Sequence, residues 1–222
     1  MRIFKIASLI IAGTLFLSGC LNYDQNTIVK ADGSGEMYLH CWIKVTEQYD
    51  SASLTKFALF NKDSLGNIFT SRFTEVEKIY VYKMNQDSVF HSKVHLSFTH
   101  FDSLGLVRGF KNFNFSFSRG PGNTIIFSHV INPFPSVFGI GRGDEEISYT
   151  YSLPGEIVKH NATGQKKNNL YWKFKSSDVE RFQTLTATYR PFKLEETPKW
   201  IYYIALSVLL IVTIFLLRSK RR

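Results

Sequence analysis

The stretch that decides the fold is residues 27–45, TIVKADGSGEMYLHCWIKV. Its last ten residues alternate between apolar and more polar side chains, and a period of two predicts a strand with one buried face. The segment between the two halves is ADGSG, whose Asp, Gly and Ser residues favour a chain reversal. Residues 27–45 are therefore predicted to form a β-hairpin. The buried face of its second strand is expected to consist of Met37, Leu39, Cys41, Ile43 and Val45.

Helical spacing follows the hairpin and then gives way to strands. Apolar residues recur at helical intervals, which predicts two short helices near 51–61 and 64–72, with Asp50 and Asp63 at their N-caps. A further helical turn is expected over 102–109. The predicted strands are 77–84, 88–98, 111–118, 123–131, 145–153, 156–160, 169–175 and 184–190. The predicted fold class is α+β: an antiparallel β-sheet with two or three short helices packed on one face, plus one C-terminal transmembrane helix.

Membrane anchors are predicted at both ends of the chain. Residues 1–19 have a basic start, an apolar stretch and small residues, which is typical of a lipoprotein signal peptide, and the LSGC sequence makes Cys20 the expected lipidated residue. Residues 20–26 are then a lipidated tether. Residues 27–194 are the expected extracytoplasmic domain, on the periplasmic or outer side of a bacterial cell membrane.

The C-terminal anchor is predicted over 199–217. This segment is almost continuously apolar, and a helix of that length just spans a hydrocarbon core of about 30 Å. Basic residues dominate 218–222, which predicts a cytoplasmic tail.

The net charge excludes nucleic acid as a partner. The formal charge is +9, but seven of the 27 basic residues lie within 1–5 or 199–222. All 18 acidic residues lie between these ends, so the intervening part has a net charge of about +2. A near-neutral domain lacks the basic surface that DNA or RNA requires.

Catalytic and metal-binding motifs are absent from the sequence. No GxSxG or HExxH motif occurs, and on a strand His91 and His95 lie about 13 Å apart, too far to share an ion. Cys41 has no internal partner once Cys20 is acylated, so we expect a buried structural thiol. We therefore expect no catalytic residue, no metal and no cofactor, and we do not expect an enzyme.

An apolar segment rich in Pro and Gly spans 132–143. Its composition disfavours regular structure, yet four of its side chains are apolar. Either they fold back over the core or they contact lipid. These residues are Phe134, Val137, Phe138 and Ile140.

Four of the eight aspartates precede Ser and an aliphatic residue. The pattern is similar to the O-glycosylation acceptor of Bacteroidetes-type bacteria. The alternative is that Asp-Ser pairs cap helices and form turns. The candidate acceptors are Ser51, Ser64, Ser88 and Ser103.

The layout resembles the LppM-type bacterial lipoproteins. The resemblance rests on LSGC over 17–20, DGSG over 32–35, LPGEIV over 153–158, NATG over 161–164, LYWKF over 170–174 and a terminal membrane helix with basic residues. It implies an exported α+β domain related to lipid-binding folds, with members linked to glycolipid binding. It transfers no binding residue to this chain.

Two functions remain open at this stage. The first is a membrane-anchored envelope module that binds a lipid or another amphiphile, motivated by the 20 phenylalanines and the apolar segment. The alternative is a structural or adaptor lipoprotein that docks another envelope protein on an exposed sheet face. The protein partners are unknown.

Overall fold

The predicted hairpin lies at the centre of the fold. In the computed structural model, β1 (Leu21–Val29) pairs antiparallel with β2 (Gly35–Lys44). Gly33 turns the chain at φ +83, and a side chain at Gly35 would overlap the carbonyl of Ile28. The hairpin prediction is confirmed, except that β1 begins at Leu21 rather than Thr27. The structure describes residues 21–44, 58–84, 88–111, 113–131, 146–175, 183–192 and 199–219.

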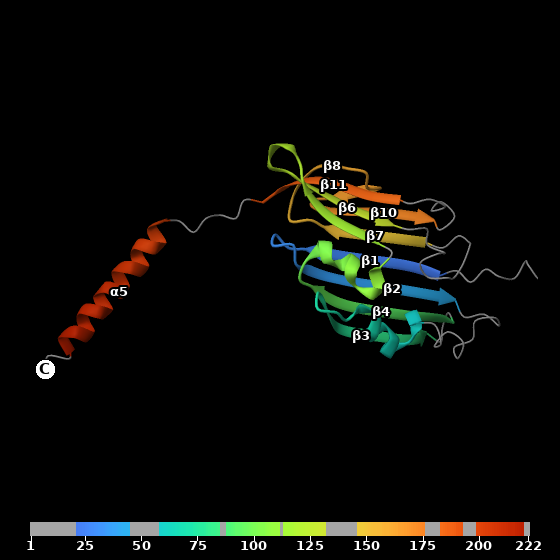
Figure 1. The fold of residues 1–222 in the computed structure, drawn as a ribbon, viewed down its shortest axis with the longest axis horizontal. Coiled ribbons are helices and arrows are strands. Elements are labelled where there is room, and N and C mark those ends of the chain that lie inside the picture. Colours follow the sequence, from blue (N-terminus) through green and yellow to red (C-terminus); the bar gives the residue numbers. More distant parts are fainter. Residues whose placement is uncertain are drawn as a thin grey trace, which may run out of the picture. The chain divides into compact units, whose positions relative to one another are not determined.

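The hairpin belongs to a seven-stranded sheet with the order β3-β4-β2-β1-β7-β10-β9 (Figure 1). Strands β1 and β7 run parallel, whereas the other neighbours in this sheet are antiparallel. The further strands are β3 (Thr74–Met84), β4 (Val89–Phe98), β7 (Glu146–Ser152), β9 (Gly164–Lys166) and β10 (Asn169–Lys175).

A second sheet of four strands has the order β5-β6-β11-β8. All three pairings within it are antiparallel. Phe127 of β6 contacts Tyr151 and Trp172 of the larger sheet, with ring centroids 4.6 and 6.2 Å apart. The small sheet therefore covers the β7 and β10 side of the large one. Its strands are β5 (Asn114–Arg119), β6 (Ile125–Ile131), β8 (Gly155–His160) and β11 (Gln183–Pro191).

Short helices cover the remaining part of this face of the large sheet. The ring of Phe60 meets Phe90 of β4 at 5.5 Å, and Figure 1 shows the helical segments in front of the β1, β2 and β4 ribbons. We call the set η1, α3, η2 and η3 the helical cover. Its members are η1 (Ala58–Phe60), α3 (Lys62–Phe69), η2 (Phe101–Leu106) and η3 (Arg108–Phe110), and a further 3₁₀ turn, η4 (Pro121–Asn123), joins β5 to β6.

Asn61 is the N-cap of α3, and its Oδ1 accepts the backbone N–H of Ser64 at 2.9 Å. The predicted cap, Asp63, lies in the first turn of that helix instead. Only part of the first predicted helix is described, as η1, and the predicted turn over 102–109 is present as η2 and η3.

The core lies between the large sheet and these two coverings. Register places Trp172, Tyr149, Gln25, Leu39 and Val94 in one row across five strands, and each of these side chains is buried. Apolar burial of such a row at about 25 cal/mol per Å² is the main stabilising contribution to a fold of this kind.

The predicted fold class is wrong in two respects. The domain is mostly β with two packed sheets, rather than one antiparallel sheet covered only by helices. The physical reason is that β5, β6, β8 and β11 have their own apolar face, which needs a partner surface and finds it on the large sheet.

The second correction concerns the predicted transmembrane helix at 199–217. A helix, α5 (Lys199–Ser219), is present, and the chain divides into two compact units, Met1–Pro191 and Phe192–Arg222. Within the described residues, no helix combines the length and the apolar character needed to cross a membrane.

Candidate functional site

A small cavity lies between the helical cover and strands β1, β2 and β4. Its volume is about 10 Å³, which is room for about one water molecule. The sheet contributes Leu39, Cys41, Ser92 and Val94 to its lining, with Tyr23 at one end. The cover contributes Leu59, Leu65, Phe69, Gly109 and Phe110, and Phe113 joins them from the segment just before β5.

A chain of buried polar side chains begins at that end of the cavity. The Tyr23 hydroxyl donates to Gln25 Oε1 at 2.8 Å, and Gln25 Nε2 donates to the Thr27 and Tyr151 hydroxyl oxygens at 3.0 and 2.9 Å. The Tyr151 hydroxyl in turn lies 2.8 Å from His129 Nδ1. These five residues come from β1, β7 and β6, so the chain crosses from the large sheet to the small one. We call it the polar chain.

Two polar atoms beside the polar chain have no partner among the described residues. They are His129 Nε2 and the hydroxyl of Tyr149, and both residues are 0% exposed. Their rings are in edge contact at 5.3 Å. Each buried group of this kind costs about 1–3 kcal/mol of stability when it is left unbonded.

Burial sets the protonation of this region. It lowers the pKa of His129 to about 3, so the imidazole is neutral at physiological pH. Burial also raises the pKa of Tyr149, with the nearby Cys41 thiol as a second cause. The Cys41 pKa itself rises to about 12 through burial. The prediction that Cys41 is buried is confirmed, and the buried side chains of the described part of the chain are uncharged.

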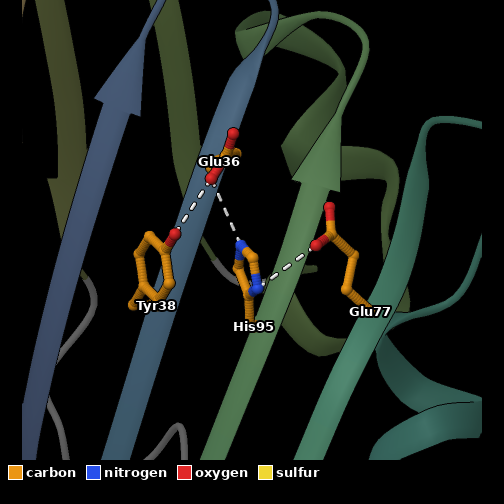
Figure 2. A network of polar contacts seen from close by, with 4 residues as sticks. All are labelled: Glu36, Tyr38, Glu77 and His95. Carbon is orange, nitrogen blue, oxygen red and sulfur yellow. Dashed lines mark hydrogen bonds and ion pairs between the residues drawn. The ribbon is translucent and has the colours of Figure 1, made fainter.

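The opposite face of the large sheet carries a separate polar network (Figure 2). Glu36 Oε2 accepts from the Tyr38 hydroxyl at 2.9 Å and lies 3.3 Å from His95 Nε2, while His95 Nδ1 lies 3.2 Å from Glu77 Oε2. Tyr38 stacks on His95 with centroids 4.2 Å apart. The hydrogen bond from Tyr38, followed by that from His95, lowers the Glu36 pKa. We call these four residues the outer network.

His91 belongs to a neighbouring group rather than to the outer network. Its Nδ1 lies 3.0 Å from His40 Nε2, and its ring stacks on Tyr82. Burial, followed by the charge of Lys93 and of His91, lowers the pKa of His40 to about 4. The two histidines of the predicted strand, His91 and His95, thus have different partners. Within the described ranges, no three His, Cys, Asp or Glu side chains form a group that could hold a metal ion.

Three of the predicted site residues belong to the described part of the chain, and they lie in different elements. Ser64 lies in the first turn of α3, Ser88 precedes β4 at φ +55, and Ser103 lies in η2. Near the last of these, Asp102 Oδ1 accepts the backbone N–H of Phe117 at 2.7 Å, a structural role. Glycosylation stays a prediction. The remaining predicted sites lie outside the described residues: Cys20, Ser51, Phe134, Val137, Phe138 and Ile140.

Sequence reasoning missed the polar chain, although a signal was present. Gln25 and Thr27 alternate in phase with Tyr23 and Val29, so they occupy the inward positions of β1. Because the first strand was predicted to begin at Thr27, the inward positions of Tyr23 and Gln25 were not recognised. The partners on β6 and β7 are about a hundred residues or more away in sequence, and pairing over that distance leaves no local pattern.

The chain is similar to a known protein in its structure rather than in its sequence. No family model matches the chain, and no curated protein matches its sequence. Among solved structures, the NMR structure of the folded domain of Mycobacterium tuberculosis LppM matches with a TM-score of 0.51 and 16% identity, covering 83% of this chain and 96% of that one. The fold is LppM-like. The expected resemblance is thus confirmed for the fold.

Proposed function

We propose that the chain is a lipid-anchored lipoprotein of a bacterial cell envelope whose domain binds an amphiphile between the large sheet and the helical cover. One observation carries the proposal: an apolar cavity ends at a buried polar chain. An apolar chamber with a few polar groups at one end matches the two parts of an amphiphile. In this proposal, lipid on Cys20 attaches the chain to the membrane. The role of the domain is to bind a ligand rather than to catalyse a reaction.

The cavity has room for about one water molecule, so entry of an acyl chain requires the cover to move. The cover consists of short elements; α3 has eight residues, and the 3₁₀ segments are shorter still. Helices of this length are marginal without tertiary packing. Side chains such as Leu65 and Phe69 hold α3 on the sheet, and they can separate from it without breaking a strand pairing.

Two independent observations, the LppM-like fold and the LSGC sequence, support the proposal. The fold is similar to that of the folded domain of Mycobacterium tuberculosis LppM. The sequence before Cys20 predicts export and acylation. A lipid-anchored domain stays close to a supply of amphiphiles, which raises the chance of encounter.

Lipid extraction tests the proposal. The full chain is purified from bacterial membranes in a mild detergent and its bound lipids are quantified. We expect about one amphiphile per chain, and its loss in Val94→Phe, which fills the cavity. Val158→Phe is the matched control because Val158 is 54% exposed on β8. No bound amphiphile in the wild type, or equal amounts in both variants, contradicts the proposal.

A second function is favoured by the outer network. Its aromatic and charged side chains are held in place on an open face, and Tyr38 is 40% exposed. Tyrosine at a rigid surface is typical of protein interfaces. In this alternative, the lipoprotein docks another envelope protein there. Crosslinking in intact cells tests it: a partner lost in Tyr38→Ala, with no bound lipid in the wild type, selects docking over amphiphile binding.

A further inference from the structure

We infer that the amphiphile bound in the interior has an uncharged headgroup carrying a hydroxyl or carbonyl oxygen, and that His129 Nε2 and the Tyr149 hydroxyl bind it. This inference rests on the proposed function and adds the chemical class of the ligand. It depends on where the two unpartnered atoms lie, on the charge of the interior and on the donors that the atoms present.

The two unpartnered groups lie directly behind residues that line the cavity. Tyr149 contacts Tyr23, which lines the cavity, with ring centroids 5.6 Å apart. His129 contacts a second lining residue, Phe113, at 5.5 Å. Both groups therefore lie one ring contact behind the cavity lining, beside the polar chain, and a headgroup would reach them once the lining side chains move.

The interior offers no charge to balance an ionic headgroup. The buried polar residues of the described part of the chain are Gln25, Thr27, Thr74, Ser92, Thr124 and His129. None is a carboxylate, a lysine or an arginine, and His129 is neutral because burial lowers its pKa to about 3. An unpaired buried charge is strongly unfavourable. A fatty-acid carboxylate or a phosphate is therefore excluded as the buried end of the ligand.

The hydrogen-bond pattern defines what the headgroup must supply. Gln25 Nε2 donates to the Tyr151 oxygen, and we assign the Tyr151 proton to His129 Nδ1, 2.8 Å away. A neutral imidazole then carries its proton on Nε2 and presents a donor. Tyr149 presents a hydroxyl that both donates and accepts. An alcohol or ester oxygen satisfies both groups, and an alcohol also satisfies the other tautomer of His129.

Two fluorescent probes of equal chain length test the inference on the full chain held in amphipol. One is a monoacylglycerol, which is neutral and carries hydroxyls, and the other is the corresponding fatty acid at pH 7.5. The proteins are wild type, Tyr149→Phe and the control Tyr80→Phe, whose ring is 56% exposed. Each is titrated by the change in probe fluorescence. Tyr149→Phe keeps the ring and removes one unpartnered hydroxyl, so a melting temperature no lower than that of the wild type verifies its fold.

We expect the wild type and Tyr80→Phe to bind the monoacylglycerol at least about tenfold more tightly than the fatty acid. Tyr149→Phe should bind the monoacylglycerol about tenfold more weakly than the wild type does, with no change in its affinity for the fatty acid. If both probes bind equally, or the fatty acid binds better, the headgroup inference fails while amphiphile binding survives. It also fails if Tyr149→Phe binds as the wild type does, because the two atoms then serve a bound water only. If neither probe binds to any protein, the proposed function fails as well.

Discussion

At the residue scale, the distinguishing feature is a set of polar side chains buried in an aromatic core. His129 stacks on Phe115 with centroids 4.4 Å apart and touches Tyr149 and Tyr151 by ring edges. Such groups are stabilising only when they are fully hydrogen-bonded. The polar chain meets that condition for Gln25, whereas His129 Nε2 and the Tyr149 hydroxyl do not meet it within the described structure.

Acid sensitivity is the first prediction at this scale. The folded-state pKa of His129, about 3, lies below the unfolded value of about 6.5. Below pH 6.5 the unfolded chain binds a proton that the folded chain excludes. Stability is thus complete above pH 6.5 and is lost as the pH falls towards 3, by up to about 1.4 kcal/mol per pH unit.

Pulse proteolysis in urea at pH 7 and pH 5 measures this loss. We expect His129 to account for a loss of about 2 kcal/mol between the two, so His129→Phe should lose clearly less than the wild type. His40, whose pKa is lowered to about 4, adds a loss that is the same in both proteins. His100→Gln, at an exposed histidine, is the control and should behave as the wild type does. Equal losses in the wild type and His129→Phe would show that other groups are responsible.

The two tyrosines of β7 predict opposite effects on stability. Tyr151→Phe removes a hydroxyl that bonds Gln25 and His129 and should cost about 1–3 kcal/mol. Tyr149→Phe removes a hydroxyl with no described partner and should be neutral or stabilising by up to about 1 kcal/mol. Urea denaturation of the ligand-free proteins compares them. A larger loss for Tyr149→Phe would mean that its hydroxyl is bonded within the fold.

At the element scale, strands could be predicted well and their partners could not. The predicted segments 88–98 and 169–175 correspond closely to β4 and β10, since alternation along one strand is a local property. The three-residue strand β9 is too short to show a pattern. The parallel pairing of β1 with β7 joins segments far apart in sequence. Neither propensity nor periodicity contains that information, and so the two-sheet arrangement was missed.

The helical cover provides the prediction at the element scale. A Cβ added at Gly109 of η3 would overlap the ring of Phe69 in α3, so Gly109→Ala should displace the cover and cost about 1–3 kcal/mol. Gly66→Ala is the matched control in the same cover. Its new Cβ would lie 3.8 Å from Ile79 Cδ1, and the helix should gain up to about 1 kcal/mol.

Thermal or urea denaturation distinguishes the two glycine variants. The expected order of stability is Gly66→Ala, wild type, Gly109→Ala. If both variants are as stable as the wild type, η3 and α3 do not pack closely, and the cavity lining would have to be revised.

At the scale of the whole molecule, anchoring and binding belong to different parts of the chain. The interior site lies in the unit Met1–Pro191, whereas α5 belongs to the other unit. The predicted lipid attachment at Cys20 immediately precedes β1, whose Tyr23 reaches the cavity. A lipidated N-terminus would thus hold the strand that leads to the site close to the bilayer.

Acylation is the prediction at the molecular scale. Cys20→Ser should abolish incorporation of a labelled fatty acid and leave the precursor uncleaved, because the thiol is the acceptor of the lipid. Cys41→Ser is the control, since the Cys41 thiol is buried and its pKa is raised to about 12. That variant should still be labelled. Label retained in Cys20→Ser would remove the proposed anchor.

The position of a bound acyl chain tests the interior site most directly. A monoacylglycerol with a photoreactive group in its acyl chain is added to membranes that contain the full chain, irradiated, and its attachment mapped residue by residue. Amphiphile binding in the interior predicts labelling of lining residues on both sides of the cavity, such as Leu39, Val94, Leu65 and Phe110, with less labelling in Val94→Phe. Attachment confined to the outer face, at Tyr38 or His95, would contradict an interior site and favour the exposed sheet face as the binding surface.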